Sequence, residues 1–279
     1  MSGRWIAVGL AALGLLWAQQ LPLEPPHDSG QSITGAFEGW FPNPDGSLNI
    51  LVGYYNRNTK QEIDIPPGPN NRIKPGGTDQ GQPTHFLPGR QWGMFTIRVP
   101  KDFGDKKLTW TLVANGKTTV IPLNVNTLWE VQPFAEASGN TPPYIGFAET
   151  GPFVNGPLGQ STALTASLQE PLSLTVWVAD DAKAPLAGMR PRTIPVTVGW
   201  SKFRGPGAVK FASERPAVEK AEFHGPPSTT FSGKATTTAT FSEPGEYVLR
   251  VVANDWSGEG GRGFQCCGTN AQVKVSVKR

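Results

Sequence analysis

The chain has 279 residues, with 25 Lys and Arg against 22 Asp and Glu, and a formal net charge of +3 at pH 7. Charged residues make up 17% of it and lie in short mixed clusters such as KDFGDKK at 101–107. A nucleic-acid binder concentrates its basic residues on one face, so we expect no nucleic-acid partner. The 33 Gly and 27 Pro residues exceed average usage without reaching a low-complexity level, and they predict many short strands joined by tight turns.

The first 18 residues have the pattern of a secretory signal peptide. Arg4 precedes an apolar run from Trp5 to Trp17, and the small residue Ala18 follows that run. The run is shorter than the roughly 20 residues that a membrane-spanning helix needs. We therefore expect a secreted or periplasmic protein with no membrane span after signal cleavage.

The region that follows is predicted to be a flexible lead-in and then an all-β domain. Residues 19–32 are rich in Pro and polar residues and have no periodicity. From there apolar and polar residues alternate, which is the period of half-buried strands, and no helical stripe appears. Asn115-Gly116 is a strong signal for a two-residue hairpin turn. Residues 33–131 therefore form the predicted N-terminal β-sandwich domain. Its inward-facing residues are predicted to include Leu48, Ile50, Val52, Tyr54, Phe95, Ile97, Val99, Leu108, Trp110 and Leu112.

A second β domain is predicted over residues 144–279, after a small, polar and Pro-rich linker at 132–143. Each of its strands has one apolar face, and two antiparallel sheets packed face to face would bury all of these faces together. The sequence thus predicts two β-sandwich domains in tandem after the signal peptide. The alternating runs are PLSLTVWVAD, TIPVTVGW, EYVLRVVAND and NAQVKVSVK.

Three phrases in this C-terminal half carry a family resemblance: VGWSKFRGPGAVKF, ATFSEPGEYVLRVVAND and VKVSV. They resemble the immunoglobulin-like family, in particular its PKD (polycystic kidney disease) type of repeat. The resemblance implies a core Trp at Trp200, a tyrosine corner at Tyr247 and a core position at Leu249, where antibody domains have their second cysteine. With Trp110 of the first domain, these are the predicted structural core residues. The WDFGDG signature common in PKD repeats is absent, and the fold by itself implies no activity.

The N-terminal half is similar to exported bacterial proteins of no stated biochemical role. This likeness is carried by GYYNRNTKQEIDIP and QPTHFLPGRQWGMF. It implies a compartment and no mechanism.

Both cysteines stand in a long Gly-rich connection between the last two predicted strands, DWSGEGGRGFQCCGT. It is longer than a usual hairpin loop, and long loops on a rigid scaffold carry binding residues. Trp256, Phe264, Cys266 and Cys267 are therefore the predicted ligand-binding residues. Adjacent strand residues point to opposite faces, and exported cysteines are expected to be oxidised. A vicinal disulfide, an intermolecular disulfide and two packed thiols all stay open, and the pair lacks the further ligands of a zinc site.

No catalytic set is recognisable in the sequence. His27, His85 and His224 are scattered, and no GxSxG, HExxH or P-loop motif is present. We expect no catalytic residue, no cofactor, no metal and no enzyme activity. A small hydrolase built around His85, close in sequence to Phe86 and Trp92, is a third hypothesis.

Acidic residues at strand ends are a candidate calcium site. Asp180-Asp181 and Asn254-Asp255 with Glu259 could donate oxygens to the ion. Their spacing matches no EF-hand loop, and turn chemistry is the simpler interpretation.

Consecutive aromatics are a further candidate surface. In Trp40-Phe41 and Tyr54-Tyr55, one member of each pair points outward if the strand is half-buried. The outward rings would either stack on sugars or form the contact between the domains.

The leading hypothesis is an exported, non-enzymatic binding or assembly protein of the bacterial surface or periplasm. Its partner would be a protein or a glycan at the cell surface. The alternative is a carbohydrate-binding accessory module that uses exposed aromatics.

Overall fold

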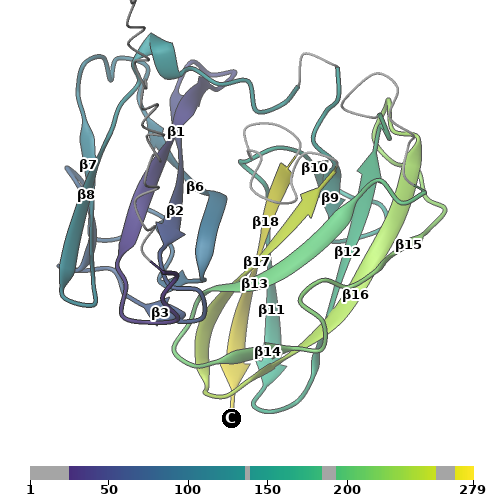
Figure 1. Cartoon of the computed structure of the whole chain (residues 1–279). Coiled ribbons are helices and arrows are strands. Elements are labelled where there is room, and N and C mark those ends of the chain that lie inside the picture. Colours follow the sequence, from purple (N-terminus) through teal and green to yellow (C-terminus); the bar gives the residue numbers. More distant parts are fainter. Residues whose placement is uncertain (1–24, 136–138, 184–192, 256–267) are drawn as a thin grey trace, which may run out of the picture.

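The computed structural model describes residues 25–135, 139–183, 193–255 and 268–279 (Figure 1). Within these ranges the protein consists of β-strands and one short 3₁₀ turn, η1 (Thr127–Trp129). The all-β fold class predicted from the period-two pattern is confirmed. No helix among the described residues is long and apolar enough to cross a membrane. The predicted signal peptide lies outside these ranges.

The first half is built from two three-stranded sheets and a small two-stranded one. One sheet has the order β1 (Ile33–Pro42), β2 (Leu48–Asn56), β6 (Gly89–Val99). The other has the order β4 (Asn71–Lys74), β7 (Leu108–Ala114), β8 (Lys117–Leu123). The third pairs β3 (Ile63–Asp64) with β5 (His85–Phe86).

The core of the first half lies between the two larger sheets. Trp110 is 1% exposed there, and its ring meets Phe95 edge-on at a centroid distance of 5.3 Å. A Cβ at Gly35 would lie 2.7 Å from the Trp110 ring, so the absence of a side chain lets β1 approach β7 closely. The β7–β8 hairpin turns at Asn115 (φ 48°) and Gly116 (φ 74°). Two positive φ angles are the geometry of the predicted two-residue turn.

The second half has two sheets, one of six strands and one of four. The first runs β10 (Phe153–Val154), β9 (Tyr144–Gly146), β12 (Leu172–Asp180), β16 (Phe231–Phe241), β14 (Val209–Phe211), and β15 (Val218–Lys220) also pairs with β16. The second runs β11 (Ser161–Ser167), β18 (Gly268–Lys278), β17 (Gly245–Asn254), β13 (Thr197–Arg204).

Alternate residues of β12, β13, β17 and β18 face inward and form one buried cluster between these sheets. Trp200 (3% exposed) and Leu249 (0%) belong to it. The sequence predicts two antiparallel sheets. This is wrong for one pair of strands, because β11 runs parallel to β18. The reason is topological: β11 and β18 are far apart in the chain, so no hairpin turn joins them and requires them to run in opposite directions.

Tyr247 fixes the turn before β17. Its ring is 1% exposed. Its hydroxyl donates to the Glu243 carbonyl at 2.8 Å and accepts from the Gly207 amide at 3.0 Å. A tyrosine whose hydroxyl bonds the backbone a few residues upstream is the tyrosine-corner arrangement, and here it also ties down the loop after β13.

Two strands depart from the expected half-buried pattern. In β2, Leu51 is as fully buried as Ile50, because β2 is the central strand of its sheet and both of its faces are covered. Phe41 of β1 is 1% exposed and meets Phe134 edge-on at 5.7 Å. The connection between the halves therefore covers the outer face of the first sheet.

We predict that Tyr247→Phe destabilises the protein by about 1–3 kcal/mol, because it leaves the buried Gly207 amide without its acceptor. Urea denaturation followed by tryptophan fluorescence measures the change. Tyr55→Phe is the matched control, since Tyr55 is 43% exposed, and it should change stability by less than about 0.5 kcal/mol. Equal effects of the two substitutions would contradict the assigned role.

Candidate functional site

The two halves meet where the edge of one sheet lies against the face of another. In Figure 1, β6 of the first half faces the sheet that contains β13, β17 and β18. A β-bulge in β6 opposite Gly53 shifts the register between β2 and β6. Gly93 lies in this bulge with φ 51°, a left-handed conformation that favours glycine. The bulge turns the Gly93 carbonyl toward the second half.

That carbonyl is the acceptor of a buried hydrogen-bonded contact between the halves. Asn270 of β18 donates to it through Nδ2 at 2.5 Å, and the Arg250 guanidinium of β17 donates at 3.4 Å. Arg250 also donates to the Trp92 carbonyl at 3.1 Å and to Asn270 Oδ1 at 2.9 Å. Asn270 and Arg250 are each 7% exposed, so these bonds are shielded from water.

A buried carboxylate supports the same bulge from the other side. Glu38 Oε2 accepts from the Gly93 amide at 2.7 Å, and Glu38 Oε1 pairs with Arg90 at 2.6 Å. Burial raises the pKa of Glu38, and Arg90 partly offsets this. Burial also lowers the pKa of Arg250 to about 10, partly offset by Tyr54 and Glu38. At neutral pH Arg250 therefore remains a cation whose hydrogen bonds compensate its loss of water.

A phenylalanine of the second half completes the core of the first. Phe203 lies at a bulge of β13, between Lys202 and Arg204, and its ring is 2% exposed within the hydrophobic cluster of the first half. Its carbonyl accepts from the Thr84 amide at 3.2 Å. The two halves thus share apolar contacts as well as hydrogen bonds.

Ion pairs flank this contact. Arg204 pairs with both oxygens of Asp79, at 2.7 and 2.8 Å. Lys202 reaches Asp64 at 3.1 Å. Burial tends to raise the pKa of Asp64, but hydrogen bonds and charge from His85 and Lys202 outweigh it and lower this pKa overall.

His85 belongs to this ion-pair group. Its Nδ1 lies 2.9 Å from Asp64 Oδ1 and its Nε2 lies 3.2 Å from Glu62 Oε2. The side chain is 7% exposed. His85 does not line the cavity described next, and both of its partners belong to the first half; it meets the contact between the halves only through Asp64, which pairs with Lys202. The hydrolase hypothesis stays a prediction.

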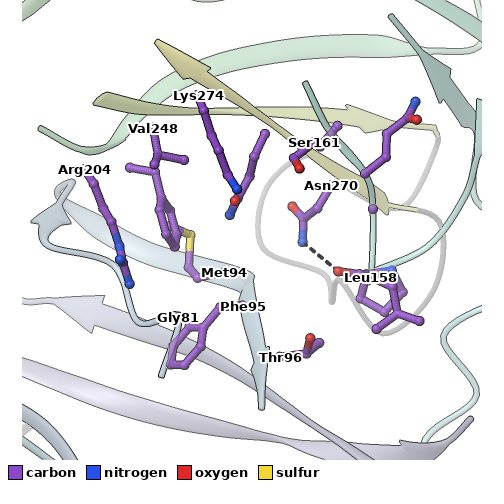
Figure 2. Close-up of a pocket in the computed structure, with 16 residues that line it drawn as sticks. Gly81, Met94, Phe95, Thr96, Leu158, Ser161, Arg204, Val248, Asn270 and Lys274 are labelled. Atoms are coloured by element: carbon purple, nitrogen blue, oxygen red, sulfur yellow. Dashed lines mark hydrogen bonds between the residues drawn. The ribbon is translucent and has the colours of Figure 1, made fainter. Parts of the chain in front are cut away.

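A cavity of about 420 Å³ opens beside the Gly93 contact (Figure 2). One wall is the strand β6 at Met94, Phe95 and Thr96, and the facing wall comes from β18 and the segment before β11. Figure 2 shows Asn270 and Ser161 across the space from Thr96, and Lys274 above Met94. We call this cavity the interdomain groove. Its lining residues are Gly81, Met94, Phe95, Thr96, Pro157, Leu158, Gly159, Gln160, Ser161, Phe203, Arg204, Val248, Asn270, Ala271, Gln272 and Lys274.

The strand-end acids identified in the sequence come together at another place, at the ends of β12 and β17. Asp180 and Asp255 are 1% and 0% exposed, and Asn140 donates to Asp255 at 2.6 Å. Asp180 Oδ2 accepts from the Ala182 amide at 2.8 Å, and Asp181 Oδ1 accepts from the Lys183 amide at 2.9 Å. These are bonds of turn chemistry.

The same acids do not form a metal site by themselves. In the described ranges no three His, Cys, Asp or Glu side chains are placed to hold a metal ion. Glu259, the fifth residue of the calcium candidate, lies outside those ranges. Asp180 Oδ1 is buried without a hydrogen-bond partner. Burial, and after it the charges of Asp255 and Asp181, raise the pKa of Asp180 to about 7.

The other candidates from the sequence are placed as follows. Trp256, Phe264, Cys266 and Cys267 lie outside the described residues, and the strands that flank them pair up to Asn254 and Gly268. Neither ring of Trp40-Phe41 is exposed, at 8% and 1%: Trp40 belongs to the core of the first half, and Phe41 is covered by Phe134 of the connection, so the pair offers no ring for stacking on sugars. Trp40 donates through its indole N–H to the Asn126 carbonyl at 2.7 Å.

Only one member of the second aromatic pair faces solvent. Tyr54 is fully buried; its backbone carbonyl accepts from the Arg90 guanidinium, and its hydroxyl accepts from the Leu87 amide. Tyr55 is 43% exposed, with the Arg57 guanidinium 5.8 Å from its ring centroid. A single ring on this strand is not the platform that the pair suggested.

Sequence reasoning missed the groove. A weak signal existed: Gly93 interrupts the alternation in QWGMFTIRV, and a glycine inside a strand pattern suggests a bulge. In the sequence, the polar residues of β18 that line the groove look like ordinary outward positions, because nothing local shows which outward face another domain covers.

We predict that Phe203→Ala destabilises the protein by about 3–5 kcal/mol, as large-to-small core substitutions do, and separates the unfolding of the two halves. Differential scanning calorimetry should show one transition in the wild type and two in the variant. Phe241→Ala is the matched control, because Phe241 is equally buried, at 2%, inside the second half alone. It should lower stability without changing the coupling. A single transition in Phe203→Ala would contradict the shared core.

We also predict a pH effect from Asp180. Its pKa in the folded state, about 7, exceeds that of an unfolded carboxyl, so folding takes up a proton between about pH 4 and pH 7. The stability contributed by the protonated form is therefore lost progressively as pH rises from about 4, and the loss is complete once pH has passed the folded pKa of about 7. Relative to the wild type, Asp180→Asn should gain about 2–4 kcal/mol of stability at pH 8 and less than about 1 kcal/mol at pH 4.5.

Urea denaturation of both proteins at pH 4.5, 6 and 8 isolates this effect, because every other titrating group is common to the two. Asp102→Asn, an exposed position, should show no such difference between pH values. A wild type that loses no stability relative to Asp180→Asn as pH rises would show that the carboxyl is not held in its protonated form.

Comparison with known proteins adds little beyond the fold. No family model matches the chain, and a search of curated proteins found no match, so the PKD resemblance stays a prediction. Among solved structures, domains 4 and 5 of the S-layer protein SbsC are 10% identical, over 89% of this chain and 98% of that one, with a TM-score of 0.24. Cadherin-like domains 1 to 4 of zebrafish RET are 12% identical, over 81% of this chain and 47% of that one, with a TM-score of 0.26. The match thus spans about half the length of the RET structure, and at these TM-scores neither likeness carries an argument.

Proposed function

We propose that this chain is an exported, non-enzymatic binding protein of the bacterial surface or periplasm, and that it binds its partner in the interdomain groove. The observation that carries the proposal is the groove itself: a cavity of about 420 Å³ with walls from both halves. This volume falls in the range of ligand sites, which are concave and largely pre-formed. The predicted signal peptide supports the compartment.

The contacts around the groove favour binding without rearrangement. The Gly93 carbonyl, the Phe203 ring and the Arg204–Asp79 pair each join the two halves. A site whose walls are held by several independent contacts loses little conformational entropy when a ligand enters. The lining residues offer hydroxyl, amide and ammonium groups at Thr96, Gln272 and Lys274 beside apolar ones.

A binding experiment with envelope preparations tests this function. Residues 19–279, fluorescently labelled, would be titrated onto envelopes from the cells that produce the chain. Ser161→Trp places a large ring in the groove, whereas Ser167→Trp places it at the far end of the same strand, outside the groove. Both serines are exposed.

The proposal expects saturable binding by the wild type and Ser167→Trp, and an affinity at least 10-fold lower for Ser161→Trp. Near-ultraviolet circular dichroism would establish that both variants keep the native packing. Indistinguishable isotherms for the three proteins would overturn the groove as the binding site, and absence of saturable binding would overturn the function.

The alternative of a carbohydrate-binding module is favoured by a different surface. On the outer side of β12, Phe153 and Phe223 stack with centroids 5.3 Å apart, and Trp177 meets Phe223 edge-on at 5.5 Å. The three rings are partly exposed. Rings of this kind can stack on sugars, so a glycan array with the wild type and Trp177→Ala distinguishes the two functions. Glycan binding lost in Trp177→Ala and kept in Ser161→Trp would favour the alternative.

A further inference from the structure

The wall of the groove formed by β6 is a strand edge. Met94, Phe95 and Thr96 are consecutive and all three line the cavity. Successive side chains of a strand point to opposite faces, so three in a row can border one space only along the edge. β6 is the last strand of the sheet β1-β2-β6. Every second residue of such a strand directs its N–H and C=O groups away from the sheet.

The second half covers this edge at one end only. At Gly93 the carbonyl is taken by Asn270 and Arg250. Along Met94–Thr96, no backbone hydrogen bond joins the edge to any described residue of the second half. As far as the described residues go, the edge therefore stands open in the groove, with hydrogen-bonding groups that an added strand would satisfy.

The facing wall is suited to contact the side chains of a segment added to β6. Asn270, Gln272 and Lys274 alternate along β18 and so share one face, next to Val248 of β17. An extended segment lying along β6 would direct alternate side chains toward this face. Its apolar part is formed by Val248 and Phe203, and its polar part by Gln272 and Lys274.

The charge of the groove selects the segment. No acidic residue is among the lining residues, and two are basic. The Arg204 guanidinium is already paired with Asp79. Lys274 is exposed and has no ion pair with any described residue. Within the described part of the chain, the uncompensated charge in the groove is thus a single ammonium group.

We propose that the groove binds an extended acidic segment of a partner protein, which adds as a strand to the free edge of β6 and directs a carboxylate at Lys274. Addition of a strand to a sheet edge takes its affinity from main-chain hydrogen bonds and its specificity from alternate side chains. The inference deepens the proposed function and rests on it. A sugar fits the groove less well, because its aromatic residues, Phe95 and Phe203, are 6% and 2% exposed and offer no open ring face.

Hexapeptide libraries test the chemistry. One library has Glu fixed at the fourth position among alternating apolar and Thr residues, and its partner library has Lys at the same position. The full exported chain should bind the Glu library and not the Lys library. In Lys274→Glu the preference should reverse, and binding of the Glu library should fall at least 10-fold. Lys210→Glu, an exposed position on β14, is the matched control and should behave as the wild type.

Two measurements on the best Glu peptide test strand addition. N-methylation of the amides on one edge of the peptide should abolish binding, whereas N-methylation on the other edge should not, because an added strand bonds through one edge. Amide hydrogen exchange between Phe95 and Ile97 should slow at least 10-fold on binding. Equal binding of the Glu and Lys libraries, no binding by either, equal effects of the two N-methylation patterns, or unchanged exchange would each overturn the inference.

The outcome is separable from that of the proposed function. Envelope binding that is lost in Ser161→Trp, together with no peptide binding, keeps the function and rejects the acidic strand. Envelope binding that is unaffected by Ser161→Trp rejects the groove as the binding site and, with it, the acidic strand.

Discussion

The arrangement of this protein depends on one backbone carbonyl, that of Gly93, which a bulge in β6 turns out of its own sheet and into the other half of the molecule. Arg250 and Asn270 donate to it in a place that water does not reach. A buried guanidinium without acceptors is costly, so the halves can separate only if Arg250 regains water or finds other acceptors. The same bulge needs a residue that tolerates a positive φ angle, which is why a glycine interrupts the strand.

The groove follows from that geometry. Where the edge of a twisted sheet meets the face of another, the two can touch along only part of their length, because the twist carries the edge away from the face. Here they touch at Gly93 and separate at Met94–Thr96, and side chains of β18 line the resulting space. A free strand edge is normally a liability for aggregation. In this molecule it forms one wall of a groove whose other wall is β18, which leaves room for a single extended segment and not for a sheet.

The charged residues at the contact between the halves fall into two groups with different roles. Glu38 and Arg250 are buried, Arg90 is partly exposed, and the three support the bulge. Lys202 links the halves by an ion pair to Asp64, whose side chain is 57% exposed and also contacts His85, and this pair contributes less because water screens it. Phe203 adds an apolar contact between the halves. Some of the residues that join the halves, namely Asn270, Phe203 and Arg204, therefore also line the candidate site.

Individual strands of this chain could be predicted because period-two alternation is a local property. Each of Leu249, Val251 and Ala253 faces inward in β17 as their spacing requires, and Asn115-Gly116 forms its turn for reasons that lie in those two residues. The outward faces could not be predicted in the same way. Trp40 and Phe41 both proved buried, since a residue that leaves one core can be covered by a distant segment such as the one that carries Phe134.

The sequence by itself determined the all-β class, the positions of the main strands and the inward face of each, because these depend on contacts within a strand and its turn. The tertiary structure alone decided which edge meets which face, that β11 runs parallel to β18, and that Lys274 shares a groove with Met94. The physical reason is that such pairings join residues far apart in the chain. The alternation that produces a strand is local, so it does not show whether the polar face of that strand will be buried against a partner.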